Sequence, residues 1–183
     1  MSRQRPSAMS IRITWALLAL ASCLGVSVAG YSWAESPNGP SAAALPTTGE
    51  ARERARILHE TIHATLQIVH HEYYREDEGL TIPAATLKRV FREVQTRQKV
   101  GLRWLAVQGE AMNSDHKPQN DFEREAAAAL AAGSEEFERV ADGTYRRAAT
   151  ITLTSECLKC HAPSRTSNKP LAAGLIVSLP VRE

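Results

Sequence analysis

Apolar residues recur at helical spacing in the first half of the domain. Between residues 50 and 76 they fall three or four positions apart, and no proline or glycine interrupts them. This pattern predicts one long amphipathic helix, whose buried stripe is Leu58, Ile62, Leu66, Val69 and Tyr73. A second helix is predicted over residues 83–98, because Pro83 suits a first turn. Its buried stripe is Leu87, Val90, Phe91 and Val94.

The second half of the chain changes to the period of strands. Alternating or continuous apolar residues predict three strands, over residues 100–107, 145–153 and 171–181. A third helix is predicted over residues 122–132, capped by Asn120 or Asp121 and ended by Gly133. Residues 135–140 are predicted to form a short helical turn, before a tight turn at Asp142 and Gly143. The order predicts an α+β fold, with long N-terminal helices packed on a small antiparallel sheet.

Residues 1–34 have the pattern of an export signal. An apolar run from residue 11 to 24 is accompanied by three arginines, Arg3, Arg5 and Arg12, and is followed by small residues. Residues 35–49 are rich in Pro, Gly, Ser and Ala, which is typical of a flexible linker. Residues 50–183 then form the predicted domain.

Three forms of the N-terminus of the exported protein are compatible with the sequence. Cys23 could be lipidated and anchor the chain, ordinary cleavage could occur before Glu35, or residues 11–33 could remain as an anchor. Each of them places the domain outside the cytoplasm, in the periplasm or an equivalent compartment. The protein carries 22 Lys and Arg against 20 Asp and Glu, a net charge of +2. This balance gives no indication of a nucleic-acid partner.

The residues Cys157, Cys160 and His161 have the C-x-x-C-H spacing of a c-type haem attachment site. In such a site the two thiols form thioethers with the vinyl groups of the haem, and the histidine donates a ring nitrogen to the iron. The expected cofactor is therefore one covalent haem c. A redox dithiol or half of a zinc site are the alternatives, but zinc needs more ligands and Cys23 lies in the export segment.

Several residues could supply a sixth ligand to the iron. On a helical wheel His59, His63 and His70 border the buried stripe of the first helix, whereas His71 points away from it. His116 and Met112 lie in a loop that could fold over the haem. Four basic residues flank the haem loop and could pair with the haem carboxylates: Arg146, Arg147, Arg165 and Lys169.

A combination of motifs resembles the Tll-type c-haem domains. The elements are a long first helix, a loop over residues 117–120 before Phe122 and Glu123, the late C-x-x-C-H, and an apolar strand over residues 173–177. The resemblance covers residues 51–181 and implies a PAS-like fold with the haem loop between the last two strands. Family members occur alone or as extracytoplasmic sensor parts of signalling proteins.

Two departures from the family pattern affect the site. The family loop usually has an arginine and a longer gap before its aromatic-Glu pair, and this chain has neither. The family also tends to carry a cysteine, which resembles an axial ligand, in the first helix where this chain has His70. The resemblance therefore implies His161 and His70 as the axial pair, and the helical wheel also favours His70. The other residues that could supply the sixth ligand are His63, then His116, then Met112.

The first functional hypothesis is an extracytoplasmic monohaem protein, similar to a c-type cytochrome, that transfers one electron or senses redox state through a six-coordinate haem. Its partner would be a redox protein or a membrane signalling protein that the sequence does not identify. The alternative is a haem-based sensor of a gas or another small ligand, with an open or displaceable distal position. An enzyme such as a peroxidase is less favoured, because no distal Arg-His arrangement is recognisable.

Overall fold

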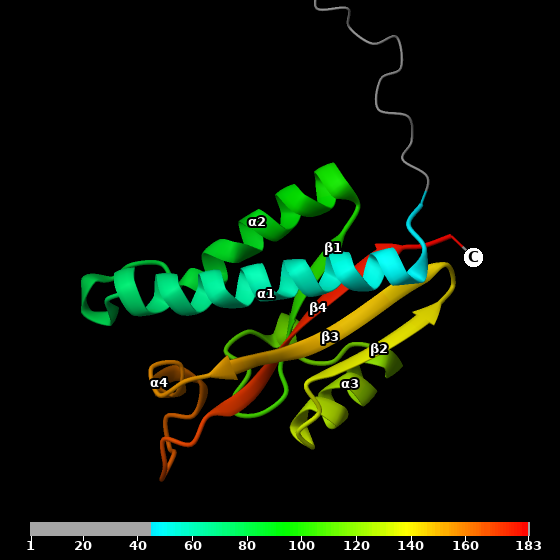
Figure 1. The fold of residues 1–183 in the computed structure, drawn as a ribbon. Helices are drawn as coiled ribbons and strands as arrows, with labels where there is room; N and C mark the ends of the chain where they lie inside the picture. The colour runs from blue at the N-terminus through cyan, green and yellow to red at the C-terminus, as the bar shows by residue number, and fades with distance from the viewer. Residues whose placement is uncertain (1–44, 183) are drawn as a thin grey trace, which may run out of the picture. The chain divides into compact units, whose positions relative to one another are not determined.

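The computed structural model describes residues 45–182, so the predicted export signal, Cys23 and most of the predicted linker lie outside the described residues (Figure 1). The first helix, α1, spans Thr48–Tyr73 and begins with a capping box. The hydroxyl of Thr47 accepts the backbone N–H of Glu50, and the Glu50 carboxylate accepts the backbone N–H of Thr47 at 2.7 Å. This reciprocal pair satisfies two N–H groups that a helix start leaves without partners.

Helices α1 and α2 (Pro83–Gln98) are joined through the short helix η1 (Glu76–Glu78). Their predicted stripes are buried or partly buried except at Tyr73 and Val90, which are exposed. The prediction for Tyr73 is wrong: it lies in the last turn of α1, beyond the sheet, where the residues that share a groove with it, among them Leu80 and Thr81, are themselves exposed (Figure 1). Among residues 45–182 no helix combines the length and the apolar character needed to cross a bilayer.

Within the described residues the sheet has the strands β1 (Gly101–Leu105), β2 (Glu136–Ala141), β3 (Thr144–Leu153) and β4 (Leu171–Pro180). Their order is β1-β4-β3-β2, and every neighbouring pair is antiparallel. Strands β2 and β3 form a hairpin whose turn residues, Asp142 and Gly143, both have positive φ, of 52° and 62°. Such a turn matches the twist of the strands that it joins. The predicted α+β class with an antiparallel sheet is confirmed.

The two faces of the sheet are covered by different helices (Figure 1). Leu175 and Val177 of β4 pack in the core beneath α1 and α2, whereas Ile176 packs against α3 (Asp121–Ala131) on the opposite face. Asn120 caps α3 by accepting the backbone N–H of Glu123 at 3.0 Å. Burial on both faces explains why β4 is a nearly continuous apolar run.

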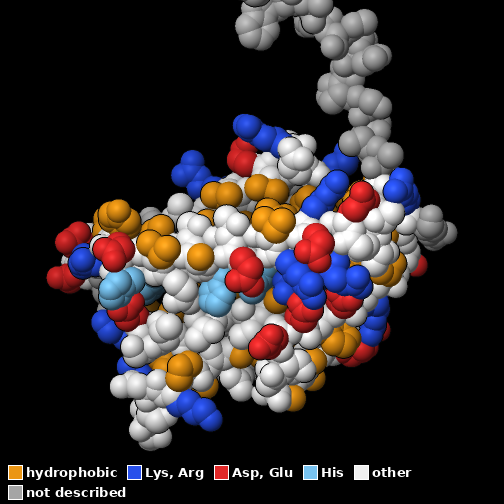
Figure 2. Space-filling model, in the orientation of Figure 1, with side chains coloured by type: hydrophobic (Ala, Val, Ile, Leu, Met, Phe, Trp, Pro, Cys, Tyr) orange, Lys and Arg blue, Asp and Glu red, His pale blue; other side chains and the backbone are white. Residues whose placement is uncertain are grey.

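Strand β2 corrects the predicted helical turn at residues 135–140. The segment pairs with β3, and its polar side chains have partners in β3 and in the helices that cover the sheet. The Glu138 carboxylate accepts hydrogen bonds from Arg52 of α1 and from the Tyr145 hydroxyl, while Phe137 packs against Phe122 with ring centroids 5.6 Å apart. Figure 2 shows acidic and basic side chains gathered over this part of α1 and β2. The strand period is therefore present, but carboxylates occupy one of its faces.

Candidate functional site

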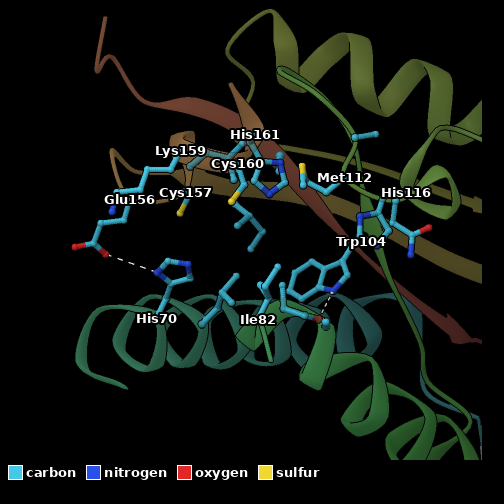
Figure 3. A pocket seen from close by; sticks show the side chains of 18 of the residues that line it. His70, Ile82, Trp104, Met112, His116, Glu156, Cys157, Lys159, Cys160 and His161 are labelled. Atoms are coloured by element: carbon cyan, nitrogen blue, oxygen red, sulfur yellow. Dashed lines mark hydrogen bonds and ion pairs between the residues drawn. The ribbon is translucent and has the colours of Figure 1, made fainter. Parts of the chain in front are cut away.

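A cavity of about 760 Å³ lies under the second half of α1, beside the start of α2 and the adjoining ends of β1, β3 and β4 (Figure 3). This volume is in the range of cavities that bind small molecules and cofactors. Its apolar wall includes Leu66, Trp104, Leu105, Ile151, Leu153 and Ala173. Trp104 is fixed by donating its indole N–H to the carbonyl of Ala84 at 3.1 Å.

The C-x-x-C-H motif forms one wall of this cavity. It lies in the connection between β3 and β4, where α4 (Leu158–His161) is a single turn of helix anchored by the buried side chain of Leu158. Cys157 and Cys160 both line the cavity as free thiols. Arg165 donates to the carbonyls of Leu158, at 3.0 Å, and Ala162, and so holds the end of α4. The predicted position of the motif, between the last two strands, is confirmed.

His161 is fixed by two hydrogen bonds to one residue. Its Nδ1–H donates to the backbone carbonyl of Glu110 at 3.2 Å, and its own carbonyl accepts the Glu110 N–H at 2.7 Å. Gly109 makes this approach possible: its φ is +72°, and a Cβ at that position would lie 2.5 Å from the His161 carbonyl oxygen. Since Nδ1 carries the proton, Nε2 of His161 is left with a lone pair.

The electrostatic environment of His161 favours the neutral imidazole. Burial lowers the pKa of His161, the hydrogen bond to Glu110 opposes this change, and the nearby His70 lowers the pKa further. A neutral imidazole with a defined tautomer is the form that binds a metal ion.

His70 lies on the α1 wall of the same cavity (Figure 3). Its Nδ1 is 3.7 Å from the carboxylate of Glu156, within ion-pair distance, and its ring packs on Tyr74 with centroids 4.9 Å apart. His71 is largely exposed, as the helical wheel predicts, and its Nδ1 contacts the same carboxylate at 3.1 Å. The hydrogen bond from His71 is the main cause of a lowered pKa at Glu156. Glu156 therefore lies between the two histidines as a carboxylate.

His59 and His63 are on the same helix but have partners in the sheet. His59 is buried, and its Nε2 lies 3.0 Å from the carbonyl of Thr150. His63 accepts the backbone N–H of Thr152 through Nε2 at 3.4 Å and does not line the cavity. Burial, and then the neighbouring His59, lower the pKa of His63. The structure places His63 against β3, away from the position expected of an alternative ligand.

Met112 and His116 both line the cavity. Met112 is mostly exposed at its edge, while His116 belongs to the short helix η2 (Ser114–His116). The carbonyl of His116 accepts the backbone N–H of Ala106 at 2.7 Å, which fixes η2 beside β1. Its Nε2 is enclosed by protein and has no hydrogen-bond partner within residues 45–182. Burial, followed by the nearby charges of Lys88 and Arg103, lowers the pKa of His116.

Several residues of the site were not predicted from the sequence. The contact of Glu110 with His161 and the contact of Glu156 with His70 each join segments that are far apart in the chain. No local sequence motif predicts either contact. The basic residues expected near the haem carboxylates are also placed differently. None of the four (Arg146, Arg147, Arg165 and Lys169) lines the cavity, whereas Arg75, Lys88 and Lys159 do.

Comparison with known proteins supports this description of the fold. The chain is similar to the crystal structure of the cyanobacterial heme-protein Tll0287, with a TM-score of 0.54 and 13% sequence identity over 72% of this chain and 96% of that chain. A search of curated proteins gives no match. The family model Tll0287-like matches residues 44–175, from the linker through α4 and into β4. Because that match covers most of the chain, the protein belongs to the Tll0287-like family.

Proposed function

We propose that this chain binds one haem c covalently and works outside the cytoplasm in one-electron transfer or redox sensing. One observation carries the proposal: a single cavity of about 760 Å³ is lined by both thiols of the C-x-x-C-H motif, by His161 and by His70. The similar heme-protein Tll0287 and the export signal predicted from residues 1–34 support the cofactor and the compartment.

The residues of the cavity fit a haem by their chemistry. Cys157 and Cys160 are free thiols three residues apart, and His161 has its Nδ1 proton engaged, so that Nε2 can bind iron. The largely apolar wall suits a macrocycle. A zinc site would require three or more suitable side chains together, and no such group is found within residues 45–182.

His70 is the sixth ligand that the arrangement favours. It lies on the α1 wall, and its Nδ1 lies beside the Glu156 carboxylate, so that Nε2 is the nitrogen available to a metal. A carboxylate behind a ligating histidine fixes the ring and increases its basicity. Met112 and His116 also line the cavity and are the alternatives that an experiment must exclude.

A haem supplies reversible one-electron chemistry at its iron. Two histidine ligands would leave no position for an external ligand, which favours electron exchange over gas binding. In this arrangement the protein holds the two rings at fixed orientations, through Glu110 on one side and Glu156 on the other.

The test is spectroscopic, on the matured full chain in ferric and ferrous forms, with and without carbon monoxide. We expect a low-spin wild type that does not bind carbon monoxide, and a His70→Ala variant that becomes high-spin and binds it. His71→Ala is the matched control, because His71 is the adjacent, exposed histidine that contacts the same carboxylate. A wild type that binds carbon monoxide at once would refute the six-coordinate proposal and favour the ligand sensor.

Covalent attachment is tested separately. Changing Cys157 and Cys160 together to Ala should allow the haem to be removed by acidified organic solvent, whereas the wild type should retain it. Haem that remains bound to the double variant after extraction would contradict the proposed thioether bonds.

A further inference from the structure

The two ends of the cavity differ in charge and in the elements that form them. Figure 3 shows Glu156 and His70 at the end near Cys157, with Trp104 and His116 at the other end. Lys88 of α2 belongs to the His116 end, because its ammonium is 3.6 Å from the carboxylate of Asp115, the residue that precedes His116 in η2. This contact brings α2 and η2 together at the margin of the cavity.

His116 has hydrogen-bonding capacity that the protein does not use. Its ring lines the cavity, yet its enclosed Nε2 has no partner among the described residues. A buried polar atom without a partner costs free energy, so its retention in a site calls for an explanation. Lys88 likewise has three N–H donors, and Asp115 is a mostly exposed partner that does not exhaust them.

The structure of a haem indicates which of its groups would lie at this end of the cavity. The thioether-forming vinyl groups and the two propionate carboxylates are on opposite edges of the macrocycle. A haem attached at Cys157 and Cys160 would therefore direct its carboxylates away from the motif and away from the Glu156 carboxylate. The Lys88 and His116 end is the part of the cavity that combines distance from these cysteines with a lysine ammonium and a histidine ring nitrogen that has no partner among the described residues.

We propose that Lys88 and His116 bind the propionate carboxylates of the haem, and that His116 is consequently a carboxylate-binding residue and not an iron ligand. This inference rests on the proposed haem-binding function and adds to it the residues that orient the macrocycle. It assigns the carboxylates to α2 and η2, and not to the four basic residues beside the motif that the sequence offered as candidates.

The experiment measures equilibrium binding of two probes to the full chain in which Cys157 and Cys160 are changed to serine, so that binding is reversible. The probes are ferric protoporphyrin IX and its dimethyl ester, which lacks the carboxylate charges, in the same detergent. We expect the free acid to bind at least about tenfold more tightly than the ester, since charge-assisted hydrogen bonds are lost with the ester. In a Lys88→Met, His116→Phe background the ratio should fall to about threefold or less.

Two controls make the result specific. Lys169→Met removes the same charge from a lysine outside the cavity and should keep the wild-type ratio. His116→Gln keeps a side-chain donor, so the ratio should fall less than with His116→Phe, and the iron of the matured protein should stay low-spin because His116 is not its ligand. If the double variant fails to fold, Lys88→Met alone replaces it, because Lys88 is half-exposed. This single change should reduce the ratio of acid to ester affinity in part.

The outcomes separate this inference from the proposed function. Tight but equal binding of acid and ester would overturn the carboxylate assignment and leave haem binding intact. A high-spin His116→Gln protein would also overturn it, because His116 would then be the iron ligand. Failure of both probes to bind would refute the proposed function itself.

Discussion

A single methyl group at Gly109 should disturb the wall of the cavity that holds His161. The Gly109→Ala substitution places a Cβ 2.5 Å from the carbonyl oxygen of His161, at a residue whose φ is +72°. An ordinary contact requires about 1 Å more separation. The loop that carries Glu110 must therefore move away from α4, and the two hydrogen bonds between Glu110 and His161 are lost or lengthened.

The magnitude follows from these separate costs. A left-handed conformation costs an alanine about 1 kcal/mol relative to glycine. Each of the two hydrogen bonds contributes about 0.5–1.5 kcal/mol. Gly109→Ala should therefore lower the free energy of unfolding of the full chain by about 2–4 kcal/mol, as measured by urea unfolding followed by circular dichroism. In the matured protein the freed His161 ring should also shift the reduction potential, because its Nδ1–H has lost its acceptor.

Gly79→Ala is the matched control for this experiment. Gly79 has a similar φ of +64°, but a Cβ there meets nothing within 4 Å. It should therefore cost only the conformational term, about 1 kcal/mol, and leave the reduction potential unchanged. If Gly109→Ala destabilises the protein no more than Gly79→Ala does, the close contact between the loop and His161 is not what the structure indicates.

Three further predictions concern residues around the site and the core. His59→Ala should lower the free energy of unfolding by about 1–3 kcal/mol, because it leaves the Thr150 carbonyl without its partner, whereas exposed His71→Ala should change it little. The hydrogen bond from Arg52 holds the pKa of Glu138 below its usual value. The stabilisation from this carboxylate is therefore present above the unfolded pKa of about 4.3 and is lost as pH falls through the lower folded value. Unfolding measurements from pH 6 to pH 3 should show a smaller loss of the free energy of unfolding for Glu138→Gln than for the wild type. Glu156→Gln should raise the reduction potential of the matured protein, because a negative charge beside His70 is removed, and an unchanged potential in protein-film voltammetry would argue against ligation by His70.

Much of the architecture could be predicted because its signals are local. The helical spacing of α1 and α2, the caps at Asn120 and the Asp142-Gly143 turn each depend on neighbours in the sequence. The C-x-x-C-H spacing identified the wall of the cavity for the same reason.

The missed features depend on contacts between distant segments. Strand β2 was predicted as a helical turn because Glu136 and Glu138 occupy a face that usually reads as apolar. Their carboxylates are stabilised there by arginines: Arg147 lies in the paired strand, and Arg52 lies some eighty residues away in α1. The contact of Gly109 with His161 is equally non-local, so the sequence shows only a glycine after a strand.

The histidines of α1 show most clearly why the helical wheel alone could not choose a ligand. His59, His63 and His70 share one face of the helix, but that face crosses two different environments. Strand β2 pairs with β3 only as far as residue 149, and the Thr150 N–H still reaches the carbonyl of Glu135; beyond this point the Thr150 carbonyl and both backbone groups of Thr152 need other partners. His59 and His63 supply them, as does Gln67 at the next turn of the helix.

His70 comes after these three side chains along α1, beyond the last residue of β3 that they contact, and its ring lines the cavity. Whether a histidine of α1 binds the backbone of β3 or is free to act as a ligand thus depends on where β2 and β3 end. Variants should reflect this division: loss of His63 should affect the free energy of unfolding, and loss of His70 the spectrum of the bound haem. A His63→Ala protein with altered iron coordination and wild-type stability would contradict the division.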